Sequence, residues 1–188
     1  MTSQERKLAV AFLVILATAS LPCTDTWQRF SSSSCFSVSY PATWFRIGAS
    51  ADRLQLLSSK DGAEGIVIKR GQAEITVVEG EGSPTKTLEE VIHYYTKGAS
   101  ILSRESIFTK RDDQGCRDLK EVMSKEEAVP PADSPISVPH VVNTNFFCEL
   151  GSHKVVVLLR NWEGDDRQQE YQLVALQMAK SIRLMQRE

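Results

Sequence analysis

Cys35-Phe-Ser-Val-Ser-Tyr-Pro-Ala-Thr-Trp-Phe45 is the stretch of this 188-residue sequence that best predicts the fold. Its first half alternates large apolar residues with serines, which is typical of a strand with one buried face: Phe36, Val38 and Tyr40. Pro41 lacks the amide hydrogen that a further ladder bond needs, so we expect the strand to stop there. Trp44 follows at the turn, and we expect it to be a core residue.

The next part of the chain predicts a β-meander followed by a helix. Short apolar runs at 54–57, 66–69 and 75–78 are separated by turn signals at 61–62 and 70–71. A glycine-rich loop at 79–84 then ends the meander. Thr87 and Glu90 have the spacing of a capping box, and the apolar stripe of the helix ends near Gly98: Leu88, Val91, Ile92 and Tyr95.

The middle of the chain gives a weaker prediction. Residues 100–110 are typical of an extended segment. Residues 118–127 have the composition of a helix, and their apolar positions fit helical spacing as well as a strand. Residues 128–139 contain four prolines, which indicates a long surface loop.

The last third predicts a hairpin and a closing helix. Runs at 142–148 and 154–159 flank Gly151, and the second run is apolar on both faces, so we expect it to be a central strand. Asp165 or Asp166 is expected to cap a helix with the apolar stripe Tyr171, Val174, Ala175, Met178 and Ile182. Two helices on a mainly antiparallel sheet make an α+β domain, which we place at 34–188.

The N-terminus predicts export. Arg6 and Lys7 precede an apolar run at 8–16, and Ala17-Thr-Ala19 is a small-x-small cleavage pattern, so residues 1–19 are expected to be a signal peptide. That run is shorter than the roughly 20 residues that cross a bilayer, and we expect no membrane-spanning segment after cleavage. Residues 20–33 form a polar lead, and 24–34 are expected to be a loosely ordered connector. Cys23 suggests a lipid anchor, but Pro22 departs from the small residue usual before such a cysteine.

Four cysteines remain in the exported chain, and an even number there favours disulfides. Three pairings are possible, of which we favour Cys23 with Cys35 and Cys116 with Cys148. No Cys-x-x-Cys is present, which argues against a redox dithiol or a zinc knuckle.

Charge and composition exclude some classes of function. Cleavage would remove Glu5, Arg6 and Lys7, one acid and two bases, so the net charge would change from −2 to −3. A nucleic-acid-binding protein would instead show a clustered basic face. The composition, with 41% hydrophobic and 24% charged residues, is that of an ordinary globular domain.

Residues with catalytic or binding potential are few. The three histidines are His93, expected on a helix flank, and His140 and His153, expected to be solvated. The sequence has no Gly-x-Ser-x-Gly or His-Glu-x-x-His, so we expect neither an enzyme nor a cofactor. Residues 163–166 lack the alternating ligands of a calcium loop. Trp27 and Trp162 lie in polar surroundings and are candidate partner-surface residues.

The motif Tyr40-Pro-Ala-Thr-Trp44 and the element order over about residues 34–183 resemble the PsbP-like family. That family takes its name from an extrinsic protein of photosystem II. It shares an α/β/α sandwich with a Ran-binding nuclear-import factor and with bacterial exported proteins. The family order makes 116–124 a strand, and we prefer this to the local helical propensity.

The resemblance implies an exported, non-enzymatic accessory, binding or assembly module that acts through protein partners. A periplasmic or extracellular location is expected, or a lumenal one in a photosynthetic organism. One alternative is a secreted hydrolase with a site assembled from scattered residues. Another is a chaperone for exported cargo, which predicts an exposed apolar groove between sheet and helix.

Overall fold

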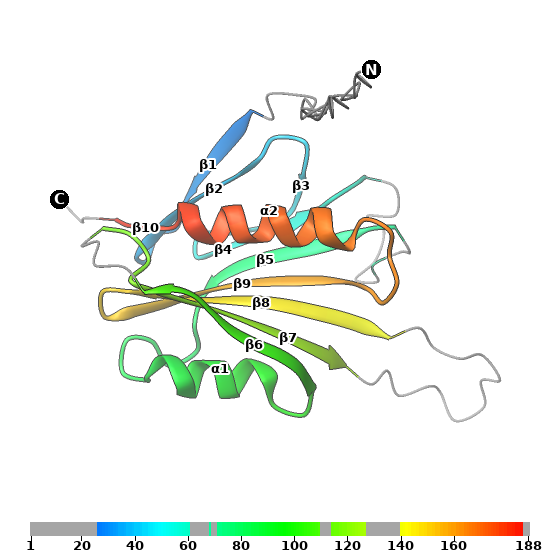
Figure 1. The fold of residues 1–188 in the computed structure, drawn as a ribbon. Helices are drawn as coiled ribbons and strands as arrows, with labels where there is room; N and C mark the ends of the chain where they lie inside the picture. The colour runs from blue at the N-terminus through cyan, green and yellow to red at the C-terminus, as the bar shows by residue number, and fades with distance from the viewer. Residues whose placement is uncertain (1–25, 61–67, 69–70, 110–113, 127–139, 186–188) are drawn as a thin grey trace, which may run out of the picture.

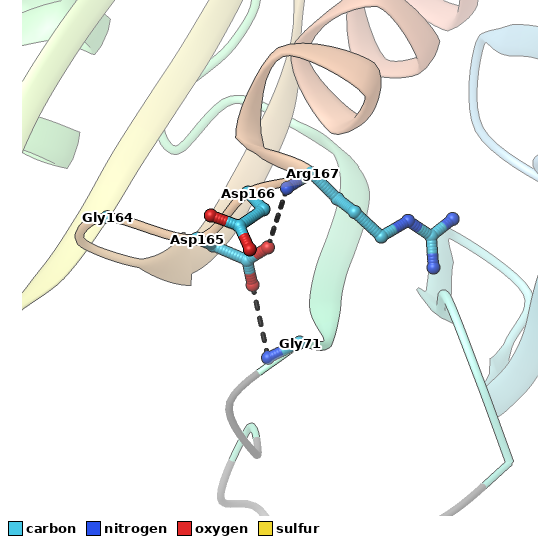
Figure 2. A pocket seen from close by; sticks show the side chains of 5 residues that line it. All are labelled: Gly71, Gly164, Asp165, Asp166 and Arg167. Carbon is cyan, nitrogen blue, oxygen red and sulfur yellow. Dashed lines mark hydrogen bonds between the residues drawn. The ribbon is translucent and has the colours of Figure 1, made fainter.

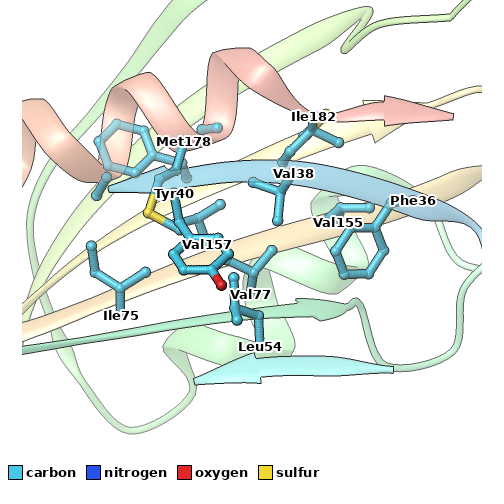
Figure 3. Packing of buried hydrophobic residues seen from close by; sticks show 14 of the residues in the cluster. Phe36, Val38, Tyr40, Leu54, Ile75, Val77, Val155, Val157, Met178 and Ile182 are labelled. Carbon is cyan, nitrogen blue, oxygen red and sulfur yellow. The ribbon is translucent and has the colours of Figure 1, made fainter. Parts of the chain in front are cut away.

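The computed structural model describes residues 26–60, 68, 71–109, 114–126 and 140–185. A seven-stranded sheet forms the middle layer, and one helix lies on each of its faces (Figure 1). A three-stranded sheet lies on the same face as the second helix (Figure 3). The predicted α+β fold with a mainly antiparallel sheet between helices is therefore confirmed.

The large sheet is antiparallel throughout and has its most apolar strand at its centre. In spatial order its strands are β3 (Phe45–Ser50), β4 (Arg53–Leu57), β5 (Ala73–Glu79), β9 (His153–Trp162), β8 (Val141–Leu150), β7 (Asp118–Glu126) and β6 (Ser100–Thr109). Val155, Val156 and Val157 of β9 are all fully buried, although successive side chains point to opposite faces. The prediction of a central strand covered on both sides is confirmed.

The small sheet consists of β1 (Trp27–Ser31), β2 (Phe36–Pro41) and β10 (Arg183–Leu184), with β2 in the middle. The prediction of a loosely ordered connector over 24–34 is wrong for most of its described part, because residues 27–31 form β1 and pair with residues 37–41 of β2. Phe30 packs against Phe36 with 6.1 Å between ring centroids. A serine-rich composition says nothing about this backbone pairing, which depends on the strand that follows.

The decisive stretch forms β2, which lies across the face of the large sheet beside the second helix (Figure 3). Its apolar side chains are buried, as predicted, and they belong to one core cluster with residues of β9, β5 and β4. The strand ends at Pro41, and Trp44 is buried with its ring 5.9 Å from that of Tyr171. The serine side of β2 is less open than expected, since Ser37 is buried and its hydroxyl accepts a hydrogen bond from Arg29 at 2.7 Å.

Helix α1 (Leu88–Thr96) has the predicted capping box. The backbone N–H of Thr87 donates to the Glu90 carboxylate at 2.7 Å, and the N–H of Glu90 donates to the Thr87 hydroxyl at 3.3 Å. The apolar stripe of α1 packs on the face of the sheet opposite to β2, in one cluster with residues of β7, β8 and β9: Val122, Phe147 and Val156.

Helix α2 (Gln168–Ser181) has the predicted apolar stripe, with Tyr171, Ala175 and Met178 fully buried. The predicted cap is wrong, because the N-cap residue is Arg167 and its side chain makes no capping hydrogen bond. Asp165 lies two residues earlier, and its carboxylate accepts the Arg167 N–H at 2.9 Å. The carboxylate thus stabilises the turn that leads into the helix.

For two further strands, β7 and β3, the local sequence did not predict the structure that is observed. Residues 118–126 form β7, so the helix that their composition favours is wrong and the strand given by the family order is confirmed. Strand β3 was not among the predicted strands. The predicted features at 61–62, 66–67, 69 and 128–139 lie outside the described residues, although Ile68 is described and buried.

A disulfide joins Cys116 to Cys148, one of the two pairings that we favoured. Cys35 is buried, and Cys23 lies outside the described residues, as does the predicted signal peptide. The pairing of Cys23 with Cys35 therefore stays a prediction. Among the described residues, no helix combines the length and the apolar character needed to cross a membrane.

Candidate functional site

A groove runs between α2 and the neighbouring strands of the large sheet. Helix α2 packs on β9, β8 and β2, and the groove opens on its β7 side. The groove has a volume of about 280 Å³ and is lined by Glu121, Phe146, Gln169, Gln172, Leu173 and Leu176. Phe146 is buried and forms its floor, whereas Leu173 exposes 60% of its surface. This combination leaves an apolar surface open to another molecule.

Two carboxylates add negative charge to the β7 side of the groove. Glu121 lies directly opposite Glu105 in the pairing of β7 with β6, so the two side chains share a face of the sheet. Burial raises the pKa of Glu121, and the charge of Glu105 raises it further. A cation brought to this position would favour the ionised form of Glu121.

A second hollow, of about 420 Å³, lies where α2 begins (Figure 2). Figure 2 shows the Asp165 carboxylate between two backbone N–H groups, those of Gly71 at 3.1 Å and Arg167 at 2.9 Å. The Arg167 guanidinium instead forms a two-pronged ion pair with Glu170 at 2.6 and 2.9 Å. The Asp165 carboxylate and the Arg167 guanidinium thus each have a partner within the chain, and the Asp165 hydrogen bonds join the start of α2 to the chain that enters β5.

A third hollow, of about 460 Å³, lies along α1 and is lined by Lys86, Glu89, Glu90, His93, Tyr94 and Lys97. Three of its charged groups, Lys86, Glu89 and Glu90, also have partners within the chain. Glu89 pairs with Arg104 and with Lys120, and the Lys86 ammonium lies 5.2 Å from the centre of the Tyr94 ring. The groove beside α2 differs from this hollow because its charge faces a like charge.

The two tryptophans proposed from the sequence lie in different sheets. Trp27 is in β1 of the small sheet and exposes 38% of its surface. Trp162 ends β9 and is half-buried, and its indole N–H donates to the Ile68 carbonyl at 2.8 Å. Trp27 is thus the more accessible of the two, and a role for either in binding stays a prediction.

The histidines also occupy separate places. His93 is exposed on α1, as expected for a helix flank. His140 is partly buried and precedes β8. His153 was expected to be solvated in a turn, but it begins β9 and its Nδ1 lies 2.7 Å from the Glu79 carboxylate.

The chaperone alternative predicted an apolar groove between sheet and helix, but sequence reasoning did not identify the residues that line it. Leu173 is an apolar residue outside the buried stripe of its helix, which was a signal for an exposed contact. Glu121 lies in a segment that the family order made a strand, but that order does not give the register that places Glu121 opposite Glu105. The sheet register was needed to bring these two carboxylates together.

The layers described above define the α/β/α sandwich class to which PsbP-like proteins belong. No protein-family model matches this sequence, and no curated protein matches it either. Among solved structures, the chain is similar to the Ran-binding protein Mog1p of Saccharomyces cerevisiae, with a TM-score of 0.52 and 12% identity over 85% of this chain and 95% of that one. It is also similar to PsbP of the cyanobacterium Synechocystis sp. PCC 6803, with a TM-score of 0.48 and 14% identity over 90% and 99% of the two chains.

A protein of unknown function from Pseudomonas aeruginosa, described as a putative regulator, is similar with a TM-score of 0.45 and 10% identity over 86% of this chain and 98% of that one. The predicted PsbP-like fold is confirmed by the likeness to Mog1p. At sequence identities this low, the similarity to these structures concerns the fold alone.

Proposed function

We propose that this protein is an exported accessory module that binds a protein partner through the groove between α2 and β7. The fold supports a binding role, because Mog1p, which shares it, is a Ran-binding protein. The observation that carries the proposal is Leu173, which exposes 60% of its surface at the edge of a groove with a buried aromatic floor. Exposed apolar surface of this kind is typical of sites that another protein covers.

The charge of the groove selects the chemistry of the partner. An apolar side chain would contact Leu173 and Leu176, while a lysine or arginine beside it would face Glu121 and Glu105. Glu121 is partly desolvated, so a cation there would interact more strongly than at an open surface. The partner is therefore a protein segment that combines an apolar residue with a basic one.

Export is part of the same proposal. The charged start, apolar run and cleavage pattern of residues 1–19 support it, and so does the Cys116–Cys148 disulfide, since such bonds persist in oxidising compartments. Mass spectrometry of the protein isolated from the periplasmic or secreted fraction should give the mass of a chain lacking residues 1–19. An intact N-terminus in a cytosolic fraction would contradict export.

A pull-down from the native exported fraction tests the groove when it is run with matched variants. Leu173→Asp places a charge on the exposed apolar residue, and Glu121→Lys reverses the charge at the groove. Tyr94→Asp is the control, because Tyr94 is exposed on α1 on the opposite face of the sheet. We expect the wild type and the control to retain the same partner, and both groove variants to lose at least about tenfold in affinity, about 1.4 kcal/mol.

Retention of the partner by both groove variants would overturn the groove as the binding surface. Synthetic peptides that pair an apolar residue with a lysine should bind, and peptides with glutamate in place of the lysine should not. A hydrolase screen run in parallel addresses the enzyme alternative. Robust turnover that is abolished by changing one histidine would overturn the binding-module proposal.

The groove also favours a second candidate, a chaperone for exported cargo, which predicted an exposed apolar groove between sheet and helix. A chaperone would suppress the aggregation of many unfolded proteins, and Leu173→Asp would remove that activity. An accessory module would instead bind one folded partner and leave aggregation unchanged. Light scattering of an unrelated, chemically unfolded protein separates the two.

A further inference from the structure

In the part of the chain that the structure describes, no helix covers β7 and β6 on the face of the large sheet that carries α2. Helix α2 packs chiefly on β9, β2 and β8. The side chains of β7 show how its two faces differ. Val122 and Ser124, which point to the α1 side, are buried, whereas Glu121 and Met123, which point to the α2 side, are partly exposed. A strip of the sheet beside α2 is therefore open.

The open strip is about as wide as one helix. Neighbouring strands of a sheet lie about 4.8 Å apart, and the axes of packed helices lie about 8 to 10 Å apart. A second helix packed against α2 would therefore lie two strands further along the sheet, over β7 and β6. Its side toward α2 would contact Leu173, and its underside would contact Glu121 and Met123. The strip can thus accommodate one helix in the same layer as α2.

The backbone around the groove offers little hydrogen bonding to a partner. Strand β7 pairs with β6 on one side and with β8 on the other, and β8 pairs in turn with β9. The N–H and C=O groups of these strands are thus used by the sheet, and those inside α2 are used by the helix. An extended segment in the groove would find no backbone partner on the side that faces the protein. A helix pairs its own N–H and C=O groups, so it can bind through its side chains alone.

The side chains of α2 that line the groove form one ridge along the helix. They stand at positions i, i+3, i+4 and i+7 of two successive turns: Gln169, Gln172, Leu173 and Leu176. A ridge with this spacing packs between the side chains of a neighbouring helix. Leu173 and Leu176 would contact the apolar stripe of that helix, together with Phe146 at the floor of the groove.

The acidic residues lie at the other border of the strip. Glu105 of β6 is exposed and lies opposite Glu121 of β7, so both carboxylates are on the face that carries α2. A lysine or arginine on the flank of the helix that points away from α2 would lie beside both. The apolar border along α2 and the acidic border along β6 thus match the two sides of a helix that is apolar on one flank and basic on the other.

We propose that the partner segment bound in the groove is an amphipathic α-helix that lies beside α2 over β7 and β6, with its basic residues toward Glu121 and Glu105. This inference rests on the proposed function, because it names the kind of partner that the same groove binds. Recognition of a helix by an apolar groove depends on apolar residues spaced three or four apart. The bound helix would complete the layer that α2 occupies only in part.

Binding of synthetic peptides to the full exported chain tests the helix. The probe is a peptide of about 18 residues with leucines at i, i+3, i+4 and i+7 and with lysines along one flank. One control peptide has the same composition with the leucine spacing scrambled, and another has a proline at its centre, which breaks a helix. We expect circular dichroism to show a gain of helix when the probe binds. Fluorescence anisotropy should show each control peptide binding at least about tenfold more weakly.

Glu105→Lys tests the position of the helix over β6. Glu105 is exposed and does not line the groove, so the substitution leaves the core and the groove intact. It should weaken binding of the lysine probe about fivefold, and a probe with glutamates in place of the lysines should bind this variant better than the wild type. Glu81→Lys is the matched control, because Glu81 is exposed in the loop after β5 and undergoes the same change of charge.

The results separate a failure of this inference from a failure of the proposed function. If the proline peptide binds as tightly as the probe and Leu173→Asp abolishes the binding of both, the groove stands and the helix is overturned. If no peptide binds, or if Leu173→Asp binds the probe as the wild type does, both are overturned. Equal losses in Glu105→Lys and Glu81→Lys would contradict the position over β6. Sedimentation should give a monomer, and a dimer that Leu173→Asp dissociates would place a second copy of the chain in the groove and overturn the helix.

Discussion

Tyr171 shows how a single side chain connects the layers of this protein. Its ring packs edge-on against Trp44, at the end of the stretch that decides the fold, and its hydroxyl donates to the Gly71 carbonyl at 2.8 Å. Gly71 also donates its N–H to Asp165 and has a positive φ of 81°, which glycine adopts readily. One end of α2 is thereby attached to the chain that enters β5.

The single residue Glu121 is expected to make the stability of the protein depend on pH. Its pKa is raised in the folded protein, first by burial and then by Glu105, above the ordinary value of 4.5. The folded state therefore binds this proton more tightly, and its stability falls as the pH rises from 4.5 through the raised pKa. Glutamine does not ionise, so Glu121→Gln should be more stable than the wild type at neutral pH, with the difference vanishing below pH 4.5.

Urea unfolding across this pH range measures the effect, and Glu89→Gln is the control of opposite sign. Hydrogen bonds from Arg104 and then Lys120 lower the pKa of Glu89. Its contribution to stability is present above pH 4.5 and is lost as the pH falls through the lowered pKa, so Glu89→Gln should be slightly less stable at neutral pH. A Glu121→Gln protein that is less stable than the wild type at neutral pH would contradict the assignment.

At the scale of elements, α1 and β7 show when local sequence is sufficient. The capping box of α1 acts within four residues, so its boundary could be predicted from the sequence. Strand β7 has helical propensity, but β6 and β8 pair with it on both sides, and its Leu119 and Val122 each enter a different core cluster. Burial on two faces and two backbone ladders outweigh a propensity difference of a few tenths of a kcal/mol per residue.

The cap of α1 can be tested with one substitution. Thr87→Ala removes the hydroxyl that accepts the Glu90 N–H, and the free energy of unfolding should fall by about 1 kcal/mol. Thr96→Ala is the matched control in the last turn of the same helix, where the hydroxyl donates to the Ile92 carbonyl without capping the N-terminus. Chemical unfolding should show the larger loss for Thr87→Ala, and equal losses would contradict the role of the cap.

At the scale of the whole molecule, strand β9 and the Cys116–Cys148 disulfide connect segments that are far apart in the sequence. Strand β9 lies between β5, from the first half of the chain, and β8. The seven-stranded sheet is therefore continuous only when the hairpin of β8 and β9 is in place. The Cys116–Cys148 bond has a sequence separation of 32 residues and joins β8 to the segment just before β7. Because the closed loop is long, the bond restricts the unfolded chain considerably.

Removal of this bond should have a large effect. For a loop of this length, the free energy of unfolding is expected to fall by roughly 3 to 4 kcal/mol in a Cys116→Ser/Cys148→Ser variant. Denaturant titrations of the wild type and the variant, both without reductant, measure the difference. A variant as stable as the wild type would show that the bond does not form in the native protein.

The sequence by itself determined the features that depend on neighbouring residues. The alternation in β2 with its stop at Pro41, the capping box of α1, the buried stripe of α2 and the apolar hairpin with β9 could all be predicted. The order of these elements was sufficient to indicate the fold class. Backbone periodicity, capping and the fixed φ of proline act over a few residues, and so they can be recognised in the sequence.

Only the tertiary structure decided the features that need two distant segments. It paired β1 with β2, brought Glu121 opposite Glu105, and brought Cys35, Glu79 and His153 together from distant parts of the sequence. The groove beside α2 belongs to this group of features. The register of a sheet and the packing of a helix on it depend on the free energy of the whole core, and a change of one residue in register would turn Glu121 to the opposite face.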